Sequence, residues 1–86
     1  MPTSEGRITV QVSLRSVLRK YRPDPNDRRP FPVELPAGST VGDLVTRLGV
    51  EPRLTKLIFI DHIRCNGDTP LRDGARVDIF PPIAGG

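Results

Sequence analysis

Hydrophobic and polar residues alternate in three segments of the chain, residues 8–14, 31–35 and 76–80. A period of two with β-branched residues on one face is typical of a strand that buries one side. Pro32 and Pro36 lack the N–H donors that a central strand needs. We therefore expect residues 31–35 to form an edge strand.

A continuous apolar run, Leu57–Ile60, predicts a buried strand. Residues 63–65 predict a further short extended segment. The pairs Asn66-Gly67 and Asp73-Gly74 are typical turn dipeptides, and they separate these segments from the strand at 76–80.

The clearest helical pattern follows Thr40, which is a favourable N-cap, and Asp43 lies at the spacing of a capping box. Gly49 is suited to the left-handed conformation that ends a helix. Val17, Leu18 and Tyr21 predict only a short helical turn, and the proline-rich residues 22–30 predict a loop. The apolar stripe of the main helix is formed by Val41, Leu44, Val45 and Leu48.

The order of these elements predicts an α+β fold with a mixed sheet of four to five strands and one main helix packed across it. A right-handed crossover would place the last strand parallel to the first in the middle of the sheet. With 86 residues, the chain has room for one small domain. We expect this domain to span residues 1–80 and to carry an extended tail, residues 81–86.

Positive charge is concentrated in one segment of the chain. The 13 Lys and Arg residues exceed the 10 Asp and Glu residues overall, and residues 15–29 contain six basic and two acidic residues. A solvated loop or a contact with an acidic protein is the favoured interpretation. Binding of nucleic acid is disfavoured because only Tyr21 is available in this segment for stacking on bases.

Several classes of protein are disfavoured by what the sequence contains. Cys65 is the only cysteine, so it cannot form an intramolecular disulfide or build a zinc site alone. The start of the chain does not resemble a secretory leader, and no apolar run approaches the roughly 20 residues that span a bilayer. We expect a cytoplasmic protein that binds no metal, no membrane and no nucleotide of its own.

The chain ends in the sequence PPIAGG, residues 81–86. Proline cannot donate to a strand ladder, so pairing should stop at Pro81, and the two prolines favour an extended exit. Ala84, Gly85 and Gly86 have almost no side chains. Six residues could extend about 20 Å from the body and carry a slender carboxyl terminus into a narrow channel.

Residues 71–86, together with the TVGDL sequence at 40–44, resemble the ubiquitin-like sulfur carriers. This family includes the small subunit of molybdopterin synthase and the thiamine-pathway carrier, and its fold is the β-grasp. The two prolines before Gly85-Gly86 are more typical of the molybdopterin synthase subunit. The basic loop at 22–30 has no obvious counterpart in the family.

The resemblance implies a carrier protein rather than an enzyme. An adenylyltransferase related to ubiquitin-activating enzymes would use ATP to adenylate the Gly86 carboxylate, and a sulfur donor would convert it to a thiocarboxylate. A second enzyme, such as the large synthase subunit, would accept the sulfur for molybdopterin synthesis. Gly85 would make the tail slender, and the expected partner-binding residues are Phe80, Pro81, Pro82, Ile83 and Ala84.

Three alternatives remain open at the level of sequence. Gly86 could be conjugated to lysines of other proteins, or the sulfur could go to thiamine or cysteine synthesis. Phe80 could belong to the core instead of a docking patch. His62 is better interpreted as a turn residue than as a catalytic base, and Cys65 as a small apolar filler than as a reactive thiol.

Overall fold

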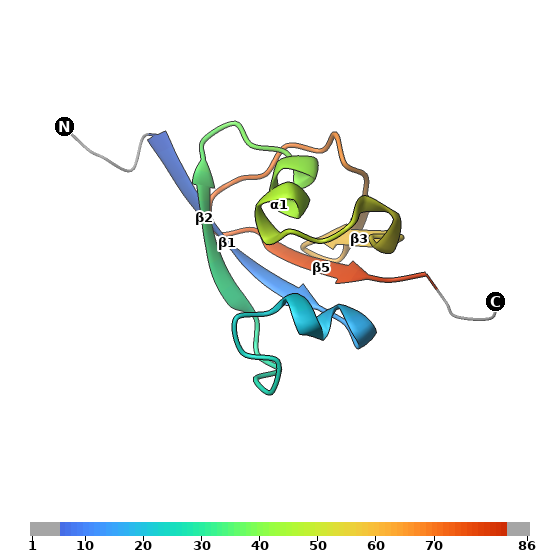
Figure 1. Ribbon diagram of the computed structural model, residues 1–86. Helices are drawn as coiled ribbons and strands as arrows, with labels where there is room; N and C mark the ends of the chain where they lie inside the picture. The colour runs from blue at the N-terminus through green and yellow to red at the C-terminus, as the bar shows by residue number, and fades with distance from the viewer. Residues whose placement is uncertain (1–5, 83–86) are drawn as a thin grey trace.

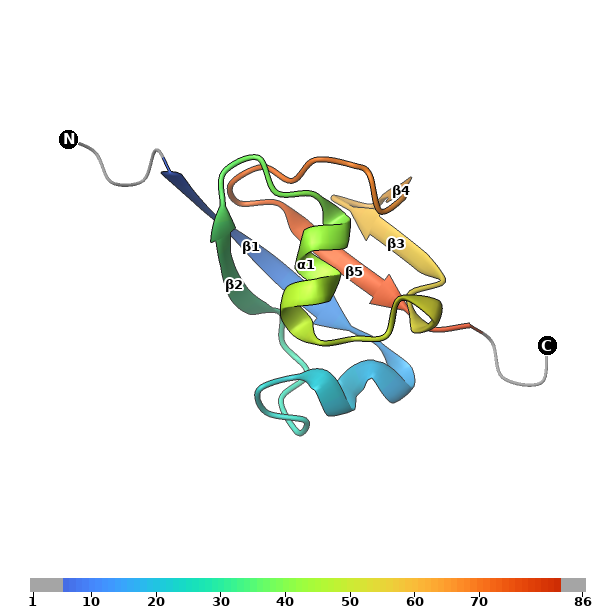
Figure 2. The same ribbon diagram turned by 45° about the horizontal axis from the view of Figure 1, so that its top comes forward.

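A sheet crossed by one α-helix forms the body of the protein in the computed structural model, which describes residues 6–82 (Figures 1 and 2). Within that range there are five strands, one α-helix and two 3₁₀ helices. In chain order they are β1 (Arg7–Leu14), η2 (Ser16–Tyr21), β2 (Phe31–Pro36), α1 (Val41–Leu48), η3 (Pro52–Leu54), β3 (Leu57–Ile60), β4 (Ile63–Cys65) and β5 (Arg76–Phe80).

The strand order in the sheet is β2-β1-β5-β3-β4. The first and last strands are parallel neighbours in the middle, and the other neighbouring pairs are antiparallel. This arrangement confirms the expected mixed sheet and its central pair. It also confirms β2 as an edge strand, as its prolines predicted.

The prolines of β2 lie on the open side of this edge. Ala37 N donates to Gly6 O at 3.0 Å, and positions 35, 33 and 31 continue that paired side along β1. Residues 32, 34 and 36 therefore direct their backbone outward, and of these only Glu34 has an N–H group. Pairing of this edge with another chain is consequently disfavoured.

The α-helix has both of the ends that the sequence predicts. Thr40 and Asp43 form a reciprocal capping box, and Gly49 has a φ of 76° at the C-cap. The N–H groups of Val41 and Gly42 donate to Thr69 O and Gly67 O, each at 2.9 Å. These two bonds attach the start of α1 to the loop that follows β4, so the first turn has few free donors.

The hydrophobic core lies between α1 and one face of the sheet (Figure 2). Residues at alternate positions of β1 and β5 face the helix, and Leu18 of η2 closes one end of the core. The largest fully buried side chains of the core are Val10, Val12, Leu14, Leu18, Val41, Leu44, Val77 and Ile79.

The structure confirms the strand expected at residues 57–60, but the expectation that it is buried is wrong for three of its four residues. Only Ile58 is buried, and Leu57, Phe59 and Ile60 are half-buried. The helix covers just one face of β3, and the alternation of side chains places Phe59 on the other face, near Phe80. An apolar run indicates a strand but does not show whether both of its faces are covered.

Candidate functional site

The exit of β5 from the sheet is fixed by a neighbour on each side. Arg15 N, just beyond β1, donates to Ile79 O at 3.0 Å, and Lys56 N, just before β3, donates to Phe80 O at 3.0 Å. Pro81 has no N–H group, so the ladder ends there. The chain thus leaves from the central part of the sheet, and Pro82 beyond it is exposed.

The structure describes only part of the tail that the sequence predicts. Phe80, Pro81 and Pro82 are described and lie together at the end of β5. Ile83, Ala84, Gly85 and Gly86 lie outside the described residues. Their proposed roles in docking and sulfur carriage stay predictions.

Phe80 lies on the sheet face opposite α1, where two other side chains contact its ring. The Phe59 ring meets it edge to face, with centroids 5.8 Å apart and planes at 85°. The guanidinium carbon of Arg15 is 5.7 Å from the Phe80 centroid. Arg15 Nη2 is also 3.2 Å from Asp78 Oδ1, so the cation is positioned by a carboxylate as well as by the ring.

These residues surround a shallow hollow of about 280 Å³, which is also lined by His62. The Asp78 side chain is 8% exposed, whereas that of Arg15 is 47% exposed. The hollow therefore has an aromatic wall, a buried anion and a solvent-accessible cation. We call Arg15, Phe59, His62, Asp78 and Phe80 the exit face.

His62 reaches the hollow from the tight turn between β3 and β4. Asp61 and His62 have positive φ values of 50° and 73°, and this turn joins the two strands. Asp61 Oδ1 accepts from Arg76 N at 3.1 Å, and its other oxygen contacts Arg72. These bonds to Arg76 and Arg72 lower the pKa of the Asp61 carboxyl. The interpretation of His62 as a turn residue is confirmed.

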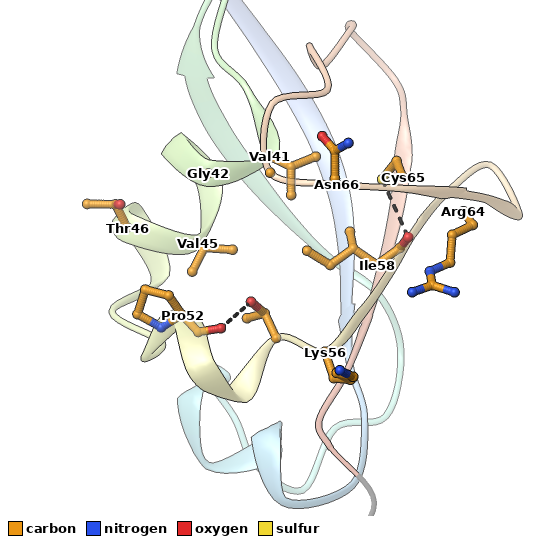
Figure 3. Close-up of a pocket in the computed structure, with 12 residues that line it drawn as sticks. Val41, Gly42, Val45, Thr46, Pro52, Lys56, Ile58, Arg64, Cys65 and Asn66 are labelled. Atoms are coloured by element: carbon orange, nitrogen blue, oxygen red, sulfur yellow. Dashed lines mark hydrogen bonds between the residues drawn. The ribbon is translucent and has the colours of Figure 1, made fainter.

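Cys65 packs against the core from β4, in agreement with its interpretation as a filler. Its Sγ lies 3.5 Å from Ile58 O, and burial raises the pKa of the thiol. A protonated thiol is a weak nucleophile. Cys65 lines a groove of about 450 Å³, into which Val45 and Ile58 point from α1 and β3 (Figure 3).

Two further features bear on the class of protein. Among residues 6–82, no group of three His, Cys, Asp or Glu side chains could hold a metal ion. The same part of the chain contains no helix that is long and apolar enough to cross a membrane.

Sequence reasoning missed three members of the exit face, namely Arg15, Phe59 and Asp78. The signal for Asp78 was present, because residues two apart on a strand share a face and Asp78 lies two residues before Phe80. Arg15 and Phe59 lie far from residue 80 in the sequence. Only the pairing of β1 and β3 with β5 brings them to the same face.

Comparisons with solved structures identify the fold as a β-grasp. The HVO 2177 protein of Haloferax volcanii superimposes with a TM-score of 0.74 at 20% identity, covering 100% of this chain and 93% of that one. A putative molybdopterin converting factor, subunit 1, from Pyrococcus furiosus gives a TM-score of 0.66 at 21% identity, covering 88% and 99%. At such identities the likeness concerns the fold alone.

Sequence comparisons extend to the family. Protein RnfH of Halorhodospira halophila is 31% identical over 87 residues, covering 94% of this chain and 81% of that protein. The model of the ThiS family matches residues 26–86, which include β2 to β5 and continue to Gly86. The chain, with its ubiquitin-like sulfur-carrier fold, therefore belongs to the ThiS family.

Proposed function

We propose that this protein is a sulfur carrier whose Gly86 carboxylate is adenylated and then converted to a thiocarboxylate. The observation that carries the proposal is the match to the ThiS family through residue 86, which includes the whole PPIAGG sequence. The exit of β5 supports it, because Arg15 and Lys56 hold the last two carbonyl groups before Pro81.

The proposed chemistry has two displacement steps, and a partner enzyme catalyses both. A Gly86 carboxylate oxygen attacks the α-phosphorus of ATP, and pyrophosphate leaves. A hydrosulfide-equivalent donor then attacks the acyl carbon, and AMP leaves with the former carboxylate oxygen. Adenylation is needed because an unmodified carboxylate has no good leaving group.

The exit face is the proposed docking surface for the adenylyltransferase. Its aromatic wall, Phe59 and Phe80, is half-buried, and Phe80 directly precedes the tail. Aromatic anchors beside a charged group are frequent at the centres of protein interfaces. Pro81 and Pro82 stiffen the exit, so a partner that binds Phe80 would receive the tail in a restricted set of directions.

Molybdopterin synthesis is the proposed destination of the sulfur. The support is the pair Pro81-Pro82 before the final glycines, which resembles the small subunit of molybdopterin synthase more than the thiamine carrier. In this proposal the chain is a non-catalytic subunit, and the large synthase subunit transfers the sulfur to a cyclic pterin precursor.

Intact-mass spectrometry of the full chain tests the carrier chemistry. After incubation with the cognate adenylyltransferase, ATP and a sulfide donor, the protein should gain the mass of one sulfur in exchange for one oxygen. A variant that lacks Gly86 should remain unchanged. An ordinary carboxylate in the full chain would contradict the proposal, and higher-mass conjugates in cell extract would indicate a protein modifier instead.

The destination is tested separately with the thiocarboxylated protein. Mixing it with the large synthase subunit and the cyclic pterin precursor should regenerate the carboxylate and form the dithiolene product. If sulfur is instead transferred only in a thiazole-forming or cysteine-forming assay, the molybdopterin assignment is wrong while the carrier function stands.

A further inference from the structure

Arg22 is a buried cation in the loop that distinguishes this sequence from the carriers it resembles. The residue is only 7% exposed, although it follows η2 at the start of a segment rich in proline and charge. Its guanidinium carbon lies 5.3 Å from the centroid of the Phe31 ring on β2. Its Nη2 donates to Arg29 O, which closes the loop. The expectation of a solvated loop is therefore wrong for this side chain.

The charge of Arg22 is not neutralised by an ion pair within residues 6–82. In the same range, its Nε is buried without a hydrogen-bond partner. The nearby acids form their ion pairs with other cations, since Asp27 Oδ2 pairs with Arg29 at 2.9 Å and Glu34 with Arg7 at 3.7 Å; Arg22 acts on Asp27 only through a longer-range attraction. Burial of an unpaired cation is unfavourable, so an anion supplied from outside would stabilise this arrangement.

Arg22 lines an open groove of about 340 Å³ between the end of η2, strand β2 and the C-terminal turn of α1. Arg47 enters the same groove from α1, is exposed, and makes no ion pair with any described residue. Tyr21, Phe31 and Leu48 supply apolar surface. Two guanidinium groups without an ion pair thus line the groove beside aromatic rings, and the acid on its lining, Glu34, is paired with Arg7.

Positive charge continues outside the groove. Arg19, Lys20 and Arg28 are exposed on the flanking η2 and loop. A ligand with a single negative charge would bind only in the groove, whereas a segment with several acidic side chains would also interact with these flanking cations. Guanidinium groups bind planar carboxylates through paired hydrogen bonds, which suits Arg22 and Arg47.

We propose that this groove receives a carboxylate side chain from an acidic segment of a partner protein. Arg22 and Arg47 are its cationic ligands, and the rings of Tyr21 and Phe31 pack against the neighbouring part of the segment. The site lies at the β2 edge, two strands away from β5, so it is separate from the exit face. The proposal concerns a second partner surface and does not depend on sulfur chemistry.

Tyr21 provides a direct probe, because it lines the groove and is the only tyrosine in a chain without tryptophan. The full-length protein is titrated with a blocked hexaglutamate peptide at low salt while tyrosine fluorescence is recorded. Arg47→Gln removes one groove cation from an exposed position. Arg64→Gln is the matched control, because it removes one exposed cation from β4 at the opposite edge of the sheet.

Hexaglutamate should change the Tyr21 fluorescence, with affinity that decreases as salt increases. Arg47→Gln should weaken binding about tenfold, a typical effect of losing a charge-assisted hydrogen bond, whereas Arg64→Gln should change it less than about twofold. Arg22→Lys keeps the charge but loses the paired donors and the bond to Arg29 O, so binding should weaken and the unfolding midpoint should fall; circular dichroism verifies that the variant is folded during the titration.

Three outcomes would overturn the proposal. Equal effects of Arg47→Gln and Arg64→Gln would show unspecific attraction to net charge. Saturable binding of inorganic phosphate as tight as that of the peptide would show a site for small oxyanions. Tighter binding of an oligothymidylate, measured by anisotropy of a labelled strand, would show a nucleic-acid surface.

Discussion

Phe80→Ala separates the proposed docking role of the exit face from its contribution to folding. The substitution removes an edge-to-face aromatic pair with Phe59 and a cation–π contact with Arg15. These contacts contribute about 0.5–1.5 and 0.5–1 kcal/mol respectively. When the loss of half-buried ring area is added to the loss of these contacts, the free energy of unfolding should fall by about 2–3 kcal/mol. A small domain with a typical stability of about 5–10 kcal/mol remains folded after such a loss.

Phe31→Ala is the matched control. Phe31 is also half-buried and also has a guanidinium over its ring, that of Arg22 at 5.3 Å, but it lies on the edge strand β2. Both variants should lose comparable stability in chemical denaturation. In an adenylation assay with the cognate adenylyltransferase, kcat/KM should fall about tenfold or more for Phe80→Ala, as expected for an aromatic interface anchor, and change little for Phe31→Ala.

The reasoning is refuted if both variants lose activity only in proportion to their unfolded fraction. Phe80 would then be a packing residue, which is the other interpretation that the sequence leaves open. It is equally refuted if Phe80→Ala retains full kcat/KM while losing stability. Circular dichroism at the assay temperature establishes the folded fraction in each case.

Three further predictions concern the fold. Asp43→Ala removes the acceptor of Thr40 N, 2.9 Å away, and should lower the free energy of unfolding by about 1 kcal/mol in urea titrations. Replacing both Pro32 and Pro36 by threonine restores outward N–H donors on β2, and concentration-dependent association should appear in sedimentation velocity. The bonds to Arg76 and Arg72 lower the pKa of the Asp61 carboxyl in the folded protein below its ordinary value of 3.8. The ionised carboxylate therefore stabilises the fold above pH 3.8, and this stabilisation is lost as the pH falls through the folded-state pKa. Asp61→Asn should therefore unfold at lower temperature near neutral pH and show a weaker decrease of Tm with acid; an unchanged acid dependence would contradict this assignment.

Local signals in the sequence predicted much of the fold. The alternation in residues 8–14 and 76–80 predicts strands because one covered face requires it, and Thr40, Asp43 and Gly49 predict the helix ends because their side chains or backbone freedom act within one turn. The prolines of β2 located an edge without any knowledge of the neighbouring strand. Each of these features depends on interactions over a few residues.

Features set by contacts between distant segments were not predictable in this way. Arg22 has every local sign of a solvated residue, yet it is buried because β2 brings Phe31 beneath it. The single apolar run at 57–60 was overestimated for the opposite reason, since the one α-helix among the described residues covers a single face of the sheet. Burial in both cases depends on tertiary arrangement rather than on composition.

The basic segment at 15–29 contributes cations to two separate surfaces of the structure. Arg15 belongs to the exit of β5, where its backbone N–H holds Ile79 O and its side chain joins Asp78 to the Phe80 ring. Arg22 lies at the other end of η2 and lines the groove with residues of β2 and α1. The net charge of the segment therefore overstates the positive surface available to any one partner. Substitutions at Arg15 should change how the tail is presented to the adenylyltransferase, and substitutions at Arg47 should change the binding of acidic segments. The two effects should be independent because the exit face and the groove share no residue.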